Sequence, residues 1–292
     1  MNILITGASG FLGSALALHF LEGGHRVAIL LRPTSQLDRL HGREAAFDLG
    51  RCESDEEIEA FISRIEPEAI IHTACAYGRQ GENLVRINDS NLRFGLVILQ
   101  AVLRSKKPVT FINTGTVLEE NVSSYALTKH QFSQWGRFLA SQPTNQLRFV
   151  NVLLQHMYGP SDDPSKFTTH VLNTCHRNEP TLKLTSGEQK RDFIYIDDVV
   201  SAYSTLIEQR TKLSNIVDIE VGSGIAPTIR EFVLSIHKLT ASKTELQFGA
   251  LPYRPNEPMY LKADISQMKS LGWQPKFNLE LGLRRTLELE FN

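Results

Sequence analysis

Apolar residues recur along the chain with two different periods. Up to about Gln155, short runs of β-branched and apolar residues alternate with longer stretches in which Leu, Ile, Val and Phe return at helical spacing. The predicted strands are NILIT, RVAILL, AAFDL, AIIHTA, PVTFINT and LRFVNVLL, and the predicted helices between them cover residues 11–23, 54–65, 83–106 and 124–141. Strands that are apolar on both faces and alternate with helices indicate an α/β fold with a doubly wound parallel sheet, covered by helices on both sides.

The pattern changes after residues 158–160. Helices are predicted near residues 165–178, 197–210, 228–240, 264–272 and 279–289, separated by short strands and Pro-rich loops such as LPYRPNEP. We expect a main domain over residues 1–160, to which residues 191–221 return, and a smaller lobe formed mainly by residues 161–292. This lobe is expected beside the carboxyl ends of the strands, where open α/β sheets bind ligands.

Composition excludes several classes of protein. The 292 residues are 41% hydrophobic and 22% charged, which is typical of a soluble globular protein. A formal net charge of -1 and the lack of a polybasic block argue against nucleic-acid binding. The chain has no apolar run near the ~20 residues that span a bilayer and no basic segment before its first apolar run, so we expect neither a membrane span nor a signal peptide, and a cytoplasmic location.

The three cysteines, Cys52, Cys75 and Cys175, include no CxxC pair. An odd number without that spacing fits free structural thiols in a reducing compartment. We therefore expect neither a disulfide framework nor a metal site.

Three glycines follow the first predicted strand in TGASGFLG. A side chain at Gly7 would block a tight turn, Gly10 lies where a helix N-terminus offers N–H groups to phosphate, and Gly13 lets the helix pack close to the strand. The segment favours a dinucleotide site, although its spacing differs from GxGxxG and a plain strand-turn-helix remains the alternative. The candidate cofactor-binding residues here are Gly7, Ser9, Gly10, Phe11, Leu12 and Gly13.

A tyrosine and a lysine stand four residues apart in the predicted helix SSYALTKHQFSQW. Tyr125 and Lys129 therefore share one helix face. A phenol titrates well above neutral pH, so Tyr125 can act as an acid or base only if a fixed positive charge such as that of Lys129 stabilises the phenolate. The preceding strand ends in FINTGT, which puts the hydroxyls of Thr114 and Thr116 at the carboxyl edge of the sheet, where they can hold a carbonyl or alcohol oxygen. Taken singly, each of these signals is compatible with chance.

Together, TGASGFLG, Thr114, Tyr125-x3-Lys129, MYGP and RDFIYIDDVV resemble the extended short-chain dehydrogenase/reductases, a group of nucleotide-sugar epimerases, dehydratases and ketoreductases. The resemblance covers nearly the whole chain, because ADISQMKSLGWQPKFNLELGLRRTLE also looks like the usual ending of that group. It implies a Rossmann fold with an NAD(P)-binding domain, and a substrate-binding lobe at the C-terminal end.

The resemblance also implies catalytic roles. Tyr125 would be the general acid/base, and Lys129 would support it and bind the nicotinamide ribose. Thr114 would polarise the substrate oxygen, with Thr116 able to share that task. Asn91 would support the active-site helix, or would be an ordinary helix-packing asparagine.

Cofactor contacts follow from the same resemblance. Asp48 and Leu49, expected after the third strand, would contact the adenine, and Ala74 would line the central part of the cofactor. The second strand ends in ILLRPTS without an acidic residue for the ribose hydroxyls. Arg32 can instead pair with a 2'-phosphate, which favours NADP(H), whereas a solvated Arg32 would leave NAD(H) possible.

In the C-terminal lobe, Arg191 and Arg254 match arginines that hold the nucleotide diphosphate, a task suited to the bidentate guanidinium. A solvated surface arginine is the alternative for each. His156 stands where the family usually has an asparagine and is expected near the sugar or its phosphates, or else in the core.

Two departures narrow the reaction. Dehydratases of the group carry Asp-Glu directly after the catalytic threonine, where this chain has Gly115 and Thr116, so elimination is disfavoured. The segment between Thr114 and Tyr125 is short, and it resembles that of bacterial enzymes that reduce CDP-4-keto-3,6-dideoxyhexoses.

We therefore predict an oxidoreductase that uses NADPH to reduce the 4-keto group of a nucleotide-linked 4-keto-6-deoxy or 3,6-dideoxy hexose, in deoxysugar or surface-polysaccharide (O-antigen, lipopolysaccharide) synthesis. The substrate would be CDP-, dTDP- or GDP-linked, and the family resemblance implies a homodimer through the helices at 83–106 and 124–141. An NAD-dependent nucleotide-sugar 4-epimerase is the first alternative. A non-catalytic NADP-binding regulator is the second, although the complete Thr-Tyr-Lys set argues against it.

Overall fold

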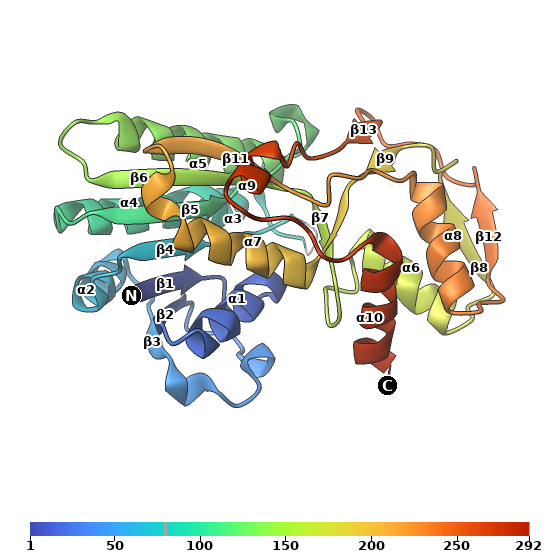
Figure 1. Cartoon of the computed structure of the whole chain (residues 1–292), viewed down its shortest axis with the longest axis horizontal. Helices are drawn as coiled ribbons and strands as arrows, with labels where there is room; N and C mark the ends of the chain where they lie inside the picture. Colours follow the sequence, from blue (N-terminus) through green and yellow to red (C-terminus); the bar gives the residue numbers. More distant parts are fainter. Residues whose placement is uncertain (79–80, 292) are drawn as a thin grey trace. The chain divides into compact units, whose positions relative to one another are not determined.

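The computed structural model describes residues 1–78 and 81–291 (Figure 1). The chain divides into two compact units. The first consists of Met1–Leu153 and Tyr203–Ile219, and the second of Leu154–Ala202 and Glu220–Asn292. Helix α7 (Ile196–Glu208) begins in the second unit and ends in the first.

A parallel sheet forms the centre of the first unit. Among the described residues it has seven strands in the order β11-β6-β5-β4-β1-β2-β3, and the pairings from β6 to β3 are parallel. The strands are β1 (Asn2–Thr6), β2 (Arg26–Leu31), β3 (Asp48–Arg51), β4 (Ala69–His72), β5 (Val109–Thr114), β6 (Leu147–Leu154) and β11 (Ile216–Val221). The predicted doubly wound α/β class is confirmed.

The direction of strand succession reverses between β1 and β4. From β1 the chain proceeds to β2 and β3 on one side, and then to β4, β5 and β6 on the other. The register pairs Thr6 with His72 and His72 with Asn113, so the carboxyl ends of β1, β4 and β5 meet at one edge. Such a switch point is where open α/β sheets bind ligands.

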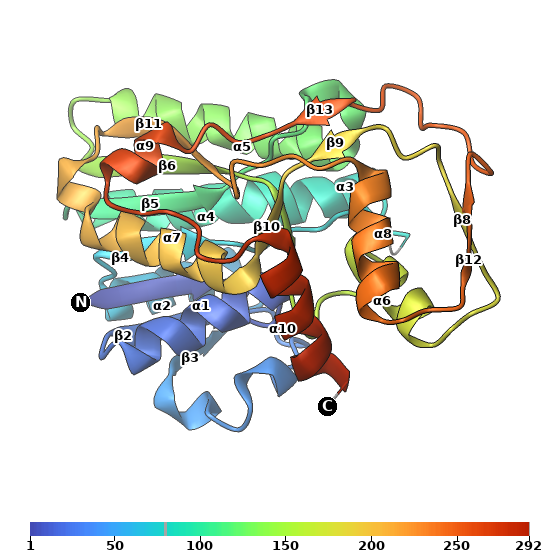
Figure 2. The same cartoon turned by 45° about the vertical axis from the view of Figure 1, so that its right-hand side comes forward.

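Helices cover both faces of this sheet (Figure 2). On one face lie α2 (Asp55–Ile65), α4 (Phe94–Arg104) and α5 (Ser124–Ser141), and on the other lie α1 (Phe11–Glu22) and the last part of α7. Short 3-10 turns complete the unit: η1 (Asp38–Leu40), η2 (Glu44–Ala46), η4 (Glu120–Val122) and η5 (Arg210–Lys212).

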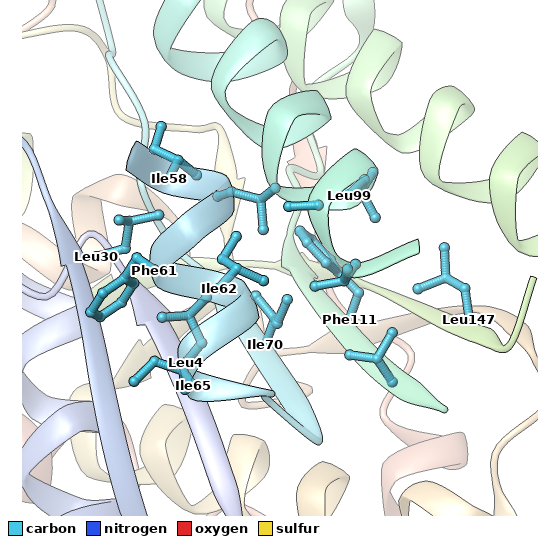
Figure 3. Close-up of a cluster of buried hydrophobic side chains, with 14 of the residues drawn as sticks. Leu4, Leu30, Ile58, Phe61, Ile62, Ile65, Ile70, Leu99, Phe111 and Leu147 are labelled. Carbon is cyan, nitrogen blue, oxygen red and sulfur yellow. The ribbon is translucent and has the colours of Figure 1, made fainter. Parts of the chain in front are cut away.

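The core under α2 and α4 shows why the strands are apolar throughout (Figure 3). Leu4, Ile70 and Phe111 project from three neighbouring strands and are fully buried against Ile62 and Leu99 of the helices. Fully burying a side chain of this size stabilises the fold by about 1.5–3 kcal/mol. The alternate strand residues are buried on the opposite face, so both faces of the sheet must be apolar.

One predicted helix is interrupted. The stretch predicted over 83–106 consists of α3 (Leu84–Asn88), a π-helical turn η3 (Asp89–Arg93) and α4. The π turn contains Asn91, which is fully buried. Single π turns occur often at functional sites, and this one directs an amide side chain inward.

The second unit contains short paired strands and helices. Among its described residues, parallel pairs form between β10 and β7, β12 and β8, and β13 and β9. The strands are β7 (His156–Tyr158), β8 (Thr181–Leu184), β9 (Lys190–Arg191), β10 (Phe193–Tyr195), β12 (Glu245–Phe248) and β13 (Tyr260–Leu261). The helices are α6 (Phe167–His176), α8 (Ile229–Leu239), α9 (Ser266–Ser270) and α10 (Leu279–Phe291), besides the start of α7.

A buried carboxylate fastens three segments of this unit. Asp192, between β9 and β10, accepts hydrogen bonds from the backbone N–H groups of Ser223, Gly224 and Ala263, at 2.7, 2.9 and 3.2 Å. The strand pair, the loop after β11 and the segment before α9 are therefore held together around one charge whose acceptor positions are satisfied.

In the described parts of the chain, no helix has both the length and the apolar character needed to cross a bilayer. Those parts also contain no cluster of three or more His, Cys, Asp and Glu side chains arranged to hold a metal ion.

Candidate active site

The glycine turn connects β1 to α1 and leaves no room for side chains. Gly7 has φ of +74°, and a Cβ there would lie 2.7 Å from the backbone nitrogen of Ala74. A Cβ at Gly13 would lie 2.5 Å from the carbonyl carbon of Gly7. The helix therefore begins directly against the turn, as the sequence predicts.

The N-terminus of α1 is open. Gly10 is the N-cap residue and provides no side-chain cap, while its own N–H donates to the Gly7 carbonyl at 2.9 Å. The first N–H groups of a helix have no acceptor within it, and the helix dipole adds a partial positive charge at this end. The turn is thus a backbone cradle for an anion such as a pyrophosphate.

The segment after β4 closes one side of the cradle. Thr73 donates from its hydroxyl to the Thr6 carbonyl at 2.7 Å, and the Ala74 N–H donates to the Thr6 hydroxyl at 3.4 Å. Ala74, a predicted cofactor contact, is therefore held beside Gly7.

Arg32 directly follows β2 and is exposed. It opens a turn in which the Ser35 N–H donates to its carbonyl at 3.0 Å. Arg51, at the end of β3, donates to the carbonyls of Pro33 and Ser35 at 2.8 and 3.0 Å and so fixes the loop that carries Arg32. The sequence pattern does not single out Arg51. The signal that could have found it is a basic residue at the carboxyl end of a predicted strand.

The predicted position of Asp48 and Leu49 is wrong. They are the first two residues of β3 rather than residues after it, and the Asp48 carboxylate accepts a hydrogen bond from Arg26 at 2.7 Å near the amino end of the sheet. The strand ends at Arg51, and a capping box starts α2 at Asp55. Cys52 directly follows β3 at the carboxyl edge, where an adenine contact was expected of the earlier pair.

Tyr125 and Lys129 lie in the first two turns of α5. The helix is capped by Ser123, whose hydroxyl accepts from the Ala126 N–H at 3.1 Å. Tyr125 is half-buried, and its ring packs against that of Tyr77, with the centroids 4.9 Å apart. Lys129 is only 2% exposed.

Burial lowers the pKa of Lys129, because the charged ammonium loses solvation, and Cys75 acts more weakly in the opposite direction. Burial also lowers the pKa of His72 to about 3, and the charge of Lys129 acts in the same direction. His72 is therefore neutral, with its Nδ1 at 2.8 Å from the Thr6 hydroxyl.

Asn91 joins the segment after β4 to α5. Its amide oxygen accepts from the Ala76 N–H at 2.7 Å, and its amide nitrogen donates to the Ala76 carbonyl and the Thr128 hydroxyl at 2.9 and 3.0 Å. Thr128 directly precedes Lys129, so Asn91 contacts the helix that carries the candidate acid.

The two threonines have different environments. Thr114 ends β5, and its hydroxyl lies 2.7 Å from the Tyr203 hydroxyl. The Thr116 hydroxyl accepts from the Leu118 N–H at 3.2 Å and closes a turn. Between them lies Gly115, where a Cβ would lie 2.6 Å from the Asn151 side-chain oxygen, so any larger residue would require Asn151 to shift.

The candidate substrate residues lie in the second unit. Arg191 is buried, donates to the Lys190 carbonyl at 2.8 Å and forms an ion pair with Glu257. Burial lowers the pKa of Arg191, against the opposing effect of Glu257. Arg254 is exposed on the loop that carries Glu257, and its carbonyl accepts from the Glu257 N–H at 3.1 Å.

His156 begins β7. Its backbone N–H donates to the Asp192 carbonyl at 3.1 Å, and its ring contacts that of Phe193 edge-on at 6.1 Å. The side chain is partly buried.

The strand order, together with a glycine cradle at the switch point, defines the Rossmann class of dinucleotide-binding α/β folds. A model of the NAD dependent epimerase/dehydratase family matches residues 3–222, and the chain belongs to this family. Both the predicted resemblance and the predicted fold are therefore confirmed.

Similar proteins span the whole chain. A CDP-abequose synthase of Salmonella typhimurium is 29% identical over 298 residues, covering 98% of this chain and 97% of the relative. A UDP-glucose 4-epimerase of Neisseria meningitidis is 22% identical, covering 95% and 94%. Among solved structures, UDP-glucose 4-epimerase from Thermotoga maritima, with UDP-glucose, superposes with a TM-score of 0.86 at 24% identity, covering 99% of this chain and 98% of that one.

Proposed function

We propose that the chain is an NADPH-dependent reductase of the 4-keto group of a nucleotide-linked 4-keto-6-deoxy or 3,6-dideoxy hexose. The observation that carries the proposal is that α5 bears Tyr125 and the buried Lys129 four residues apart, with the Tyr125 ring packed against Tyr77 of the segment after β4. The similarity to CDP-abequose synthases over the full length supports this reaction class.

The described residues fit a dinucleotide. The cradle at Gly7 and Gly13 would be filled by any Cβ, and the start of α1 has no side-chain cap. Both features suit a pyrophosphate that approaches the backbone closely. NADPH, when bound, supplies the hydride for the sugar C4.

The residues of α5 and β5 handle the proton and the oxygen. Tyr125 gives its proton to the oxygen on C4 as that oxygen gains negative charge, and Lys129 stabilises the phenolate left behind. Thr114 donates a hydrogen bond to the same oxygen. A donor fixed in advance where charge develops lowers the barrier more than one that must reorient.

Arg32 supports NADPH over NADH. It is exposed at the end of β2, on a loop that Arg51 anchors, and the chain has no carboxylate directly after β2 to bind the ribose hydroxyls. A guanidinium here suits a 2'-phosphate. Replacing Arg32 with alanine should weaken NADPH binding by about 10–100-fold, the worth of a charge-assisted hydrogen bond, and leave NADH binding unchanged, as measured by calorimetric titration. Equal losses for both cofactors would contradict the assignment.

For the sugar nucleotide we propose Arg191, Arg254 and His156 as contacts, with a CDP, dTDP or GDP carrier. The Arg191 guanidinium already donates to the Lys190 carbonyl and to the Glu257 carboxylate, so a diphosphate would have to displace Glu257 to be held by it in a bidentate way.

An NAD-dependent 4-epimerase is the second candidate, favoured by the fold similarity to UDP-glucose 4-epimerases. A dehydratase fits less well, because this chain has Gly115 and Thr116 where dehydratases of the group carry Asp-Glu.

The decisive experiment is turnover. Purified protein is mixed with CDP-, dTDP-, GDP- and UDP-linked 4-keto sugars and NADPH, and absorbance at the NADPH band is followed. We expect NADPH to be oxidised with the 4-keto sugar linked to one of these nucleotides. Tyr125→Phe should lower kcat by about 10²–10⁴-fold. If the purified protein retains NAD, interconverts UDP-glucose with its C4 epimer and oxidises no NADPH, the epimerase would be favoured. If NADPH is oxidised with none of the sugar nucleotides, a non-catalytic regulator would be favoured.

We further propose a cytoplasmic homodimer. Helix α5 exposes Leu127, Trp135 and Phe138, and α3 exposes Leu84 and Val85, which are large apolar side chains suited to contact a second copy. Sedimentation of the purified chain as a monomer at micromolar concentration would contradict the dimer.

A further inference from the structure

A buried tyrosine contacts the candidate oxygen-binding threonine. The hydroxyl of Tyr203, on the part of α7 that belongs to the first unit, lies 2.7 Å from the hydroxyl of Thr114. Tyr203 is fully buried, whereas Thr114 is partly exposed at the end of β5. Burial raises the pKa of Tyr203, so its phenol stays neutral and keeps its proton.

Counting protons indicates the direction of this hydrogen bond. Each hydroxyl has one proton to donate. Within residues 1–78 and 81–291, Thr114 is the only hydrogen-bond partner of the Tyr203 hydroxyl. If Thr114 donated, the Tyr203 proton would be buried without an acceptor, which is strongly disfavoured. Tyr203 therefore donates, and Thr114 accepts.

We propose that Tyr203 is a positioning residue, which donates a hydrogen bond to Thr114 and so turns the Thr114 proton toward the substrate oxygen. The inference rests on the proposed function, in which that oxygen is the one on C4 of the sugar. A hydroxyl that accepts one hydrogen bond becomes a stronger donor in the next, so the Tyr203-Thr114 pair polarises the substrate more than a lone threonine.

Thr116 provides the contrast. Its hydroxyl oxygen accepts from the Leu118 N–H within a local turn, and in the described structure no buried phenol lies against it. Thr116 is also buried, at 8% exposure, whereas Thr114 is partly exposed, so the proposal assigns the oxygen-binding task to Thr114.

The test combines Tyr203→Phe, Thr114→Val and the double variant, each assayed for kcat and KM with the 4-keto sugar nucleotide that wild type turns over. Phenylalanine keeps the ring in the core, and circular dichroism checks the fold. We expect Tyr203→Phe to lower kcat about tenfold, the worth of one hydrogen bond, with KM changed less than about twofold. In the Thr114→Val background, Tyr203→Phe should have no further effect.

Tyr195→Phe is the matched control. Tyr195 is also a buried tyrosine, but it lies in the second unit and has no role in the proposed reaction. The kcat of the Tyr195→Phe variant should therefore equal that of wild type. The positioning role would be overturned if Tyr203→Phe kept the wild-type kcat. It would also be overturned if Tyr203→Phe lowered kcat by the same factor in the wild-type and Thr114→Val backgrounds.

A second measurement does not depend on turnover. With tyrosine labelled at the ring carbon that bears the hydroxyl, the NMR signal of Tyr203 is identified by its loss in Tyr203→Phe. We expect Thr114→Val to shift this signal and Thr116→Val to leave it in place. If wild type turns over no substrate, the proposed reaction fails, whereas an unshifted signal shows that the hydrogen bond itself is wrong.

Discussion

Replacing Gly13 with alanine is a direct test of the glycine cradle. The new Cβ would lie 2.5 Å from the carbonyl carbon of Gly7 and closer still to its oxygen, whereas ordinary contacts begin at 3.4 Å. The turn must therefore recede by about 1 Å, and overpacking of this kind costs about 1–3 kcal/mol. The better helix propensity of alanine offsets up to about 1 kcal/mol of that cost.

The larger effect should be on cofactor binding. A shift of about 1 Å removes one or two hydrogen bonds between backbone N–H groups and a pyrophosphate, each worth about 1.5–3 kcal/mol to a charged acceptor. The Kd for the dinucleotide should therefore rise at least ~10-fold, measured by calorimetric or fluorescence titration, while thermal unfolding shows a folded protein whose Tm is lower by a few degrees.

The matched control is Gly23→Ala at the other end of α1. A Cβ at Gly23 meets its nearest atoms at 3.4 Å, with φ of -72°, so alanine fits there. This variant should bind the dinucleotide like wild type. Equal affinity in the Gly13 and Gly23 variants would refute the role of the close approach.

Lys129→Met should abolish turnover and yet stabilise the cofactor-free fold against urea, because burial disfavours the charged ammonium. The folded-state pKa lies below the unfolded value, so the unfolded chain binds more protons between the two, and wild-type stability rises with pH there. The stability advantage of the methionine variant should accordingly shrink as pH increases through that interval. Urea titrations at several pH values measure the difference in the free energy of unfolding between the two proteins. A difference in favour of methionine that grows with pH would contradict a lowered pKa of Lys129.

The sequence predicts most of the first unit because its signals are local. RVAILL and LRFVNVLL coincide with β2 and β6, and the helix at 124–141 coincides with α5, since each has an uninterrupted apolar pattern. The start of β3 was predicted too early because AAFDL is also apolar, although the capping box at Ser54 and Glu57 marks where the strand must already have ended.

Other features have no local signature. A π turn at Asp89–Arg93 has the same composition as an α-helix, so the pattern over 83–106 does not reveal it. The contact between Thr114 and Tyr203 joins residues 89 positions apart, and helical periodicity marks Tyr203 only as a buried residue. The functional assignments of Tyr125, Lys129 and the arginines stay predictions, because they rest on motif and chemistry.

Asn91 has a consequence for motion. The Asn91 amide hydrogen-bonds to the backbone N–H and carbonyl of Ala76 and to the Thr128 hydroxyl. We therefore expect the segment after β4 and the first turns of α5 to move together. Whatever rests on that segment therefore keeps its distance to the Tyr125 ring through thermal fluctuations. The π turn thus positions one amide group that links the two sides of the site.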